Sequence, residues 1–274
     1  MNTANKGPEY GNTIDVAGLE TNYLESGSGD PVLLLHGAGP GVTSYVNWYA
    51  NIPELAKNFR VVAPDAPGFG HTERRKGQDY DMDFWARHTV DLMDALGMEK
   101  AHFVGNSFGG ALTVGVATRY PDRVNKMVLM GAGGLKFEPT EGVRLVATYQ
   151  PDFESMARIM REYFPYDPSM VSDELVRSRF ETSMLPGHQE AYASVFAKFG
   201  QGVFNTPEEK IEQIKHQVLV LHGRDDVVVP FDCAVRYLNL LEHSDLHAFG
   251  ECGHWVQIEK QDAFNKLVTD FLLS

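Results

Sequence analysis

The chain has 274 residues, a formal net charge of −13 at pH 7 and an apolar fraction of 43%. This length is close to the upper limit for one hydrophobic core, so we expect one domain with an inserted subdomain. The negative charge argues against nucleic acid as a partner, because neutralising phosphates needs clustered Lys and Arg. An anionic ligand would therefore need a basic residue close to its own site.

Cysteine usage and hydropathy indicate a cytoplasmic protein. Cys233 and Cys252 are too few for a disulfide framework and suit a reducing compartment. The N-terminal segment MNTANKGPEYGNT lacks the apolar stretch of a signal peptide. No run approaches the roughly 18 apolar residues of a membrane span. We therefore expect no membrane partner, and we expect a homo-oligomer, a dimer or larger.

Short apolar runs alternate with helical patterns along the chain. The helical spacing predicts a helix over 82–96, where Gly97 suits a left-handed stop, and a second over 107–119, before Pro121. Continuous apolar runs are typical of strands buried on both faces. We predict such strands at 31–36, 60–63, 101–104, 126–130 and 217–221, and a further strand at the strand-like run 246–249. This order favours a mostly parallel sheet with helices on both faces.

Residues 135–205 contain no strand-like run. Helical patterns at 153–164 and 172–184 are separated by prolines, which predicts a helical cap inserted into the α/β core. The core resumes at Thr206, where the sequence TPEE is typical of a capping box closed by Glu209. We therefore assign 1–134 and 206–274 to the core and 135–205 to the cap.

The sequence Gly105-Asn-Ser-Phe-Gly109 follows a predicted strand and opens a predicted helix. That context is the one in which a nucleophile elbow exposes its serine, here Ser107. The motif alone is a weak signal, and an ordinary Gly-rich turn between strand and helix would give the same letters. The other members of a catalytic triad therefore decide its interpretation.

Two such members follow in the required order. Asp226 comes directly after the strand at 217–221, and His254 lies in a Gly-bearing loop after the strand-like run 246–249. Separately, an Asp after a strand often caps a turn, and a loop His is usually solvated. Together, in the order Ser, Asp, His and each at a strand's carboxyl end, they predict an α/β-hydrolase triad with His254 as base and Asp226 as its orienting acceptor. Asp225 is the competing carboxylate.

The sequence His36-Gly-Ala-Gly-Pro-Gly41 predicts the other half of an oxyanion hole, in which the N–H groups of Ala38 and Phe108 converge. Neither a phosphate-binding nor a dinucleotide-binding pattern is completed there. We interpret His36 and Asp65 as structural. The remaining histidines lack metal-ligand spacing, so we expect no metal and place them at the surface or in loops.

Read together, these motifs resemble the meta-cleavage-product hydrolases, α/β-hydrolases that cut a carbon–carbon bond in ring-opened aromatic compounds. The resemblance covers roughly residues 14–272. Its most specific marks are the Asn before the nucleophile and the Trp after the triad His. The similar stretches are 36–41 with Asn47-Trp48, 105–110, 128–134, 173–180, 223–226 and 252–255.

The resemblance implies hydrolysis of a 2-hydroxy-6-oxo-hexa-2,4-dienoate, without a cofactor, to 2-hydroxypenta-2,4-dienoate and a carboxylic acid. It implies that one side of the site holds the dienoate carboxylate and 2-hydroxyl, and that an apolar side takes the C6 substituent. The first side would contain Arg179, Asn47, Asn106 and Trp255. Gly39 is a further expected substrate-binding residue, assigned to neither side. The second would contain Phe164, Met160, Val228 and Val229.

The implied reaction begins with proton transfer to C5, with His254 as carrier, followed by attack of Ser107 on the C6 ketone. Direct attack by water through a gem-diol is the alternative route. The segment after Tyr192 is shorter than in related hydrolases, and 140–142 and 185–190 are most similar to enzymes acting on 2-hydroxymuconic semialdehyde and short alkyl analogues. A phenyl substituent stays open.

Two other classes of function fit the same motifs. A carboxylesterase or cofactor-free perhydrolase would use the same triad but would have no use for Arg179. A binding module would keep the fold and the triad without turnover. Activity on a dienoate, compared with a nitrophenyl ester, separates these hypotheses.

Overall fold

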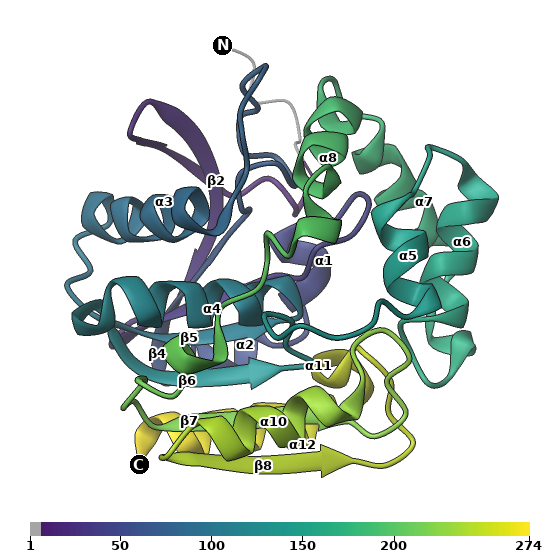
Figure 1. Ribbon diagram of the computed structural model, residues 1–274. Coiled ribbons are helices and arrows are strands. Elements are labelled where there is room, and N and C mark those ends of the chain that lie inside the picture. Colours follow the sequence, from purple (N-terminus) through teal and green to yellow (C-terminus); the bar gives the residue numbers. More distant parts are fainter. Residues whose placement is uncertain (1–6) are drawn as a thin grey trace.

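The computed structural model describes residues 7–274, so the first six residues of the predicted core lie outside the described residues. Its centre is an eight-stranded sheet in the order β1-β2-β4-β3-β5-β6-β7-β8 (Figure 1). The strands are β1 (Asn12–Val16), β2 (Leu19–Ser26), β3 (Asp30–Leu35), β4 (Phe59–Pro64), β5 (Ala101–Asn106), β6 (Val124–Met130), β7 (Val218–Gly223) and β8 (Ser244–Phe249).

Strands β3 to β8 run parallel; at one edge β2 pairs antiparallel with β4, and β1 pairs antiparallel with β2. The predicted mostly parallel sheet is confirmed, and all six predicted strands are present within one or two residues of their expected bounds. The sequence analysis missed β1 and β2. Both contain polar residues, and β1 is largely exposed, so neither has the continuous apolar run of a buried strand.

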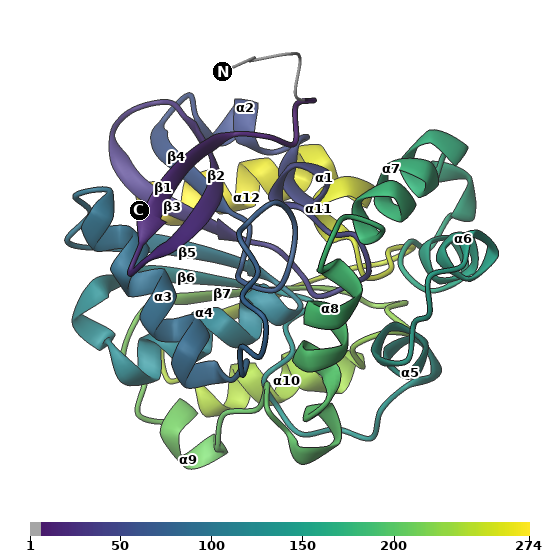
Figure 2. The ribbon, with the colours of Figure 1, turned by 90° about the horizontal axis from the view of Figure 1, so that it is seen from above.

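Alternate residues of the central strands pack against two separate apolar layers. Leu33 and Phe103 face the layer that contains α3, α4 and α10, whereas Leu34 and Val104 face the layer that contains α2, α11 and α12. Figure 2 shows these helices on opposite sides of the sheet. Because both faces are covered, the strands need apolar side chains at every position, as their sequence runs predicted.

The helices are bounded as follows. They are α1 (Ser44–Trp48), α2 (Ile52–Leu55), α3 (Met82–Ala95), α4 (Phe108–Arg119), α5 (Glu141–Ala147), α6 (Phe153–Glu162), α7 (Asp173–Ser183), α8 (His188–Phe196), α9 (Glu208–Ile211), α10 (Phe231–Leu240), α11 (Val256–Glu259) and α12 (Gln261–Leu273). Gly97 has the expected left-handed φ of 68° after α3. Short 3₁₀ turns occupy Pro121–Arg123, Pro168–Met170 and Phe199–Gln201.

Helices α5 to α8 lie between β6 and β7 in the chain, and the described residues contain no strand there. Figure 1 shows α5, α6 and α7 beyond the arrowheads of the strands, at the carboxyl edge of the sheet. The predicted helices at 153–164 and 172–184 correspond to α6 and α7. Residues that follow the parallel strands therefore face this helical segment.

Two local predictions are wrong. The capping box at Thr206 does not form: α9 begins at Glu208 after Pro207, and the Thr206 hydroxyl is buried without a hydrogen-bond partner. Several histidines expected at the surface or in loops are buried, because they lie on core elements or between packed helices. They are His88, His102, His188 and His222.

Candidate active site

Ser107 occupies a strained turn between β5 and α4, with φ 54° and ψ −113°. The flanking glycines are required by close backbone approach. A Cβ on Gly105 would lie 2.2 Å from the Gly109 carbonyl oxygen, and one on Gly109 would lie 2.0 Å from that of Leu35. The strained backbone persists because the tightly packed elements around it permit no other path. The local sequence therefore forces the Ser107 side chain out of the sheet edge, as expected of an elbow.

Asp226 and His254 come together from loops that follow β7 and β8. The Nδ1 atom of His254 lies 2.7 Å from Oδ2 of Asp226. The other carboxylate oxygen, Oδ1, accepts hydrogen bonds from the backbone N–H groups of Val228 at 2.7 Å and Val229 at 3.0 Å. Asp225 instead accepts a bond from the N–H of Cys252 at 3.3 Å. Of the two candidate carboxylates, only Asp226 reaches the imidazole.

The electrostatic environment keeps Asp226 ionised. Burial by itself would raise the pKa of Asp226, but the imidazoles of His254 and His222 beside it lower that pKa well below its usual range. His222 lies 3.4 Å from the same Oδ2 atom. An ionised carboxylate on Nδ1 fixes the tautomer in which Nε2 of His254 is free to accept a proton.

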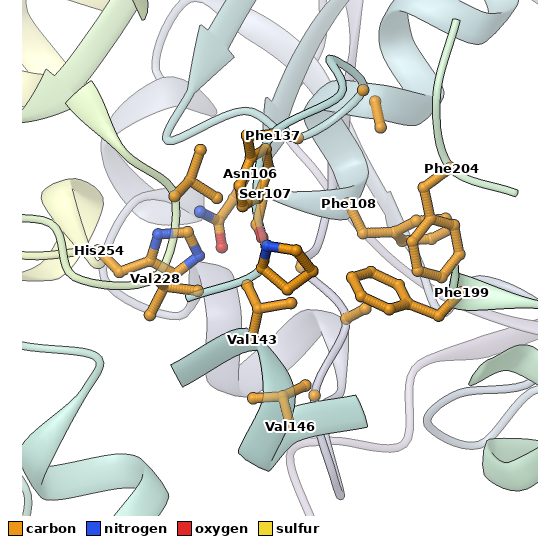
Figure 3. A pocket seen from close by; sticks show the side chains of 18 of the residues that line it. Asn106, Ser107, Phe108, Phe137, Val143, Val146, Phe199, Phe204, Val228 and His254 are labelled. Atoms are coloured by element: carbon orange, nitrogen blue, oxygen red, sulfur yellow. The ribbon is translucent and has the colours of Figure 1, made fainter. Parts of the chain in front are cut away.

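A cavity of about 450 Å³ opens in front of Ser107 and His254. Figure 3 shows both side chains at this cavity, with Asn106 between them. The hydrogen bonds of residues 7–274 include none between the Ser107 hydroxyl and His254. Such a bond is often long in a ligand-free enzyme and tightens when substrate binds.

The two predicted oxyanion donors also line this cavity. Phe108 is the first residue of α4, so its N–H has no acceptor one turn earlier in the helix. The N–H of Gly37, next to Ala38, is held by the Asn47 side-chain oxygen at 3.3 Å. His36 is buried behind this loop, where its Nε2 accepts the N–H of Ala66 at 2.9 Å. This arrangement leaves the N–H groups of Ala38 and Phe108 as the candidate donors to an oxyanion.

Arg179, from α7, contributes a buried cation to the same cavity. It is 5% exposed, and its Nε donates to the Pro40 carbonyl at 2.9 Å. Burial lowers the pKa of Arg179 to about 10, so the guanidinium stays charged at neutral pH. Within residues 7–274, Arg179 forms no ion pair. A Cβ on Gly39 would lie 2.9 Å from Nη2, so the guanidinium lies directly over this glycine.

The other residues predicted to bind the dienoate are found at the cavity too. Asn47, Asn106 and Trp255 line it, and the buried Nδ2 of Asn47 has no hydrogen-bond partner. Phe164 also lines the cavity, but its ring lies 5.0 Å from that of Trp255 and close to Gly39. It therefore belongs to the Arg179 side rather than to the side on which it was expected.

The opposite side is apolar and richer in aromatic rings than predicted. Val228 and Val229 line the cavity, and Figure 3 shows Val228 beside His254. Met160 is fully buried and is not among the lining residues, so that assignment is wrong. Figure 3 shows Phe108, Phe199 and Phe204 at one end of the cavity. Apolar lining residues that were not predicted from the sequence include Leu135, Phe137, Val143, Val146, Phe196, Phe199 and Phe204. For Phe196, Phe199 and Phe204, the sequence signal is the aromatic enrichment of 196–204.

Within residues 7–274, no three His, Cys, Asp or Glu side chains are grouped to hold a metal ion. The helices of that same part of the chain include none with the length and hydropathy needed to cross a bilayer.

Comparison with known proteins agrees with this geometry. A family model described as the alpha/beta hydrolase fold matches residues 30–261. A 2-hydroxy-6-oxo-2,4-heptadienoate hydrolase of Pseudomonas putida is 46% identical over 98% of both chains. A 2-hydroxymuconate semialdehyde hydrolase of Pseudomonas sp. strain CF600 is 42% identical over 99% of this chain and 97% of its own.

Solved structures give the same result. A meta-cleavage product hydrolase from Pseudomonas fluorescens IP01, determined as a serine-to-alanine variant with acetates, superimposes with a TM-score of 0.94. It is 46% identical and covers 97% of this chain and 98% of its own. The full-length identity to these relatives, together with the matching fold, shows that the chain belongs to the meta-cleavage product hydrolases of the α/β-hydrolase fold family.

Proposed function

We propose that this protein hydrolyses the C5–C6 bond of 2-hydroxy-6-oxo-hexa-2,4-dienoates, releasing 2-hydroxypenta-2,4-dienoate and a carboxylic acid. The observation that carries the proposal is Arg179, a buried guanidinium in the cavity that holds Ser107, which forms no ion pair with an Asp or Glu of residues 7–274. Such a cation suits a substrate that brings its own carboxylate. The names of the full-length relatives support the same substrate class.

Ser107, Asp226 and His254 form the proposed triad. The substrate first ketonises, as the proton of its 2-hydroxyl moves to C5 with His254 as carrier. Ser107 then attacks the C6 ketone while His254 takes its proton, and the N–H groups of Ala38 and Phe108 stabilise the oxyanion. When the C5–C6 bond breaks, its electron pair is delocalised onto the C2 oxygen. Water then hydrolyses the acyl-enzyme and releases the carboxylic acid.

The lining of the cavity supplies separate residues for the two parts of the substrate. Arg179, Asn47, Asn106, Trp255 and Gly39 form the end that we assign to the carboxylate and the 2-hydroxyl. We assign the apolar part of the lining, with Val228 and Val229, to the C6 substituent, and we place the bond to be cut at Ser107.

Arg179→Ala distinguishes this function from that of a plain esterase. The loss of a charge-assisted contact should lower kcat/KM on the dienoate by roughly 10- to 150-fold, equivalent to about 1.5–3 kcal/mol. A small neutral ester has no carboxylate, so its hydrolysis should change little. Stopped-flow absorbance on both substrates measures the two values.

Arg177→Ala is the matched control for this experiment, because Arg177 is on the same helix but exposed. It should leave both activities unchanged. Equal losses on both substrates for Arg179→Ala would give Arg179 a purely structural role. No loss on either would favour the carboxylesterase or perhydrolase.

Three broader predictions are kept as proposals. We propose that 1–134 and 206–274 form the core and 135–205 the cap, supported by the helices between β6 and β7. The buried free thiols of Cys233 and Cys252 support a cytoplasmic location. We also propose a homo-oligomer, a dimer or larger. Light scattering from the purified protein would measure its mass, and a 30.5 kDa particle would contradict the last proposal.

A further inference from the structure

Glu9, which precedes the first strand, joins the helix of Arg179 to the core. Its Oε1 accepts a hydrogen bond from the Ser178 hydroxyl of α7 at 2.6 Å. Its Oε2 lies 3.5 Å from the Thr182 hydroxyl of the same helix and 3.4 Å from the Thr43 hydroxyl of the core. The same oxygen is 3.6 Å from Nε2 of His71. One carboxylate thus contacts α7 and two core loops together.

The contacts on α7 surround the proposed substrate-binding cation. Ser178 immediately precedes Arg179, and Thr182 lies three residues after it, close to one helical turn away. Holding these two hydroxyls limits both the rotation and the displacement of α7 about Arg179. The Arg179 guanidinium is thereby kept over Gly39, at the end of the cavity assigned to the carboxylate.

Glu9 is negatively charged when it makes these contacts. Its side chain is 16% exposed. Burial alone would raise the pKa of Glu9, but the nearby His71 imidazole and the hydrogen bond from Ser178 lower it, with a smaller contribution from the charge of Arg179. The carboxylate is therefore ionised at neutral pH and adds a favourable field at the buried guanidinium.

The carboxylate and the guanidinium do not pair directly. The ion pairs within residues 7–274 include one between Glu9 and His71 but none between Glu9 and Arg179. A direct salt bridge would occupy the donors that a substrate carboxylate needs. Glu9 acts instead on the neighbouring hydroxyls, which leaves the terminal nitrogens of Arg179 available to a ligand.

We propose that Glu9 is a positioning residue that fixes Arg179 for binding the substrate carboxylate by fastening α7 to the core. The proposal rests on the function proposed above. A residue that merely stabilises the fold would affect all substrates alike. The effect of Glu9 must instead pass through Arg179 and must depend on a carboxylate in the substrate.

The first test compares Glu9→Ala with Glu174→Ala, in which an exposed carboxylate on the same helix is removed. For Glu9→Ala we expect KM on the dienoate to rise about tenfold, equivalent to about 1.4 kcal/mol. Because the triad is untouched, kcat should stay within about twofold. Hydrolysis of a neutral nitrophenyl ester should not change, and Glu174→Ala should resemble the wild type on both substrates. Equal losses on dienoate and ester would overturn the proposal.

A double-mutant cycle tests the route of the effect. In an Arg179→Ala background, Glu9→Ala should change KM on the dienoate by less than about twofold, because residues that act through one another are not additive. A full tenfold effect in that background would overturn the proposal. If Glu9→Ala does not fold, Glu9→Gln, which keeps one acceptor oxygen and removes the charge, enters the same cycle with a smaller expected rise.

Amide hydrogen exchange tests the role of Glu9 independently of the proposed catalytic function. Glu9→Ala should speed amide exchange in Asp173–Ser183, because α7 loses its attachment to the core, and should leave α4 unchanged. This result does not depend on any substrate. If the wild type failed to cleave a dienoate, the proposed function would fall, while unchanged exchange in α7 would by itself overturn the role of Glu9.

Discussion

Replacing Ser107 by alanine should lower kcat on the dienoate by roughly 10⁴- to 10⁶-fold, the range expected when a triad nucleophile is removed. If Ser107 is the nucleophile, no acyl-enzyme can form without its hydroxyl, and only binding and oxyanion stabilisation remain. The fold should survive, because alanine has fewer atoms than serine and the Ser107 contacts to Met130, Ala111 and Gly133 are made by its backbone.

Steady-state kinetics on the dienoate measures this loss, and circular dichroism checks the fold. Ser28→Ala serves as the control, because Ser28 is exposed in the turn before β3. It should keep wild-type turnover. Retention of more than about a tenth of wild-type kcat by Ser107→Ala would refute the nucleophile assignment, since the triad members act as a unit.

Asp226→Asn should lower kcat by roughly 10⁴-fold, because an amide holds the imidazole in the wrong tautomer and cannot stabilise an imidazolium. The structure makes this substitution unusually informative. Oδ1 is held by the N–H groups of Val228 and Val229, which leaves Oδ2 to the imidazole of His254. In the Asp226→Asn variant the amide nitrogen must therefore take the position facing Nδ1.

Asp225→Asn is the natural comparison, because the Asp225 carboxylate accepts a hydrogen bond from the N–H of Cys252 and makes no contact with the imidazole of His254 among residues 7–274. It should change kcat by less than about threefold, the scale of a single neutral hydrogen bond. Parallel measurements of kcat on the dienoate decide the matter. Comparable losses in both variants, or a larger loss for Asp225→Asn, would mean that the orienting carboxylate is Asp225.

The sequence determined the parts of this protein that depend on local geometry. Buried parallel strands need continuous apolar runs. Gly105 and Gly109 are required because a Cβ at either position would lie about 2 Å from a backbone oxygen. Both features can therefore be recognised in the amino-acid sequence. Asp226 and His254 follow β7 and β8, whose carboxyl ends lie at one edge of the sheet. The meeting of these residues could therefore be predicted without knowing the intervening chain.

Only the tertiary structure decided features made by residues far apart in the chain. The packing of the inserted helices, which no local hydrophobic periodicity specifies, decides which residues line the cavity. It places Phe164 beside Trp255, keeps Met160 out of the lining and brings Phe199 and Phe204 to one end. His88 is likewise buried beside Thr21, 67 residues away in the chain, and its Nε2 lies 2.9 Å from the Thr21 hydroxyl. Glu9 has no motif at all, because its contacts to α7 exist only once the chain has brought both segments together.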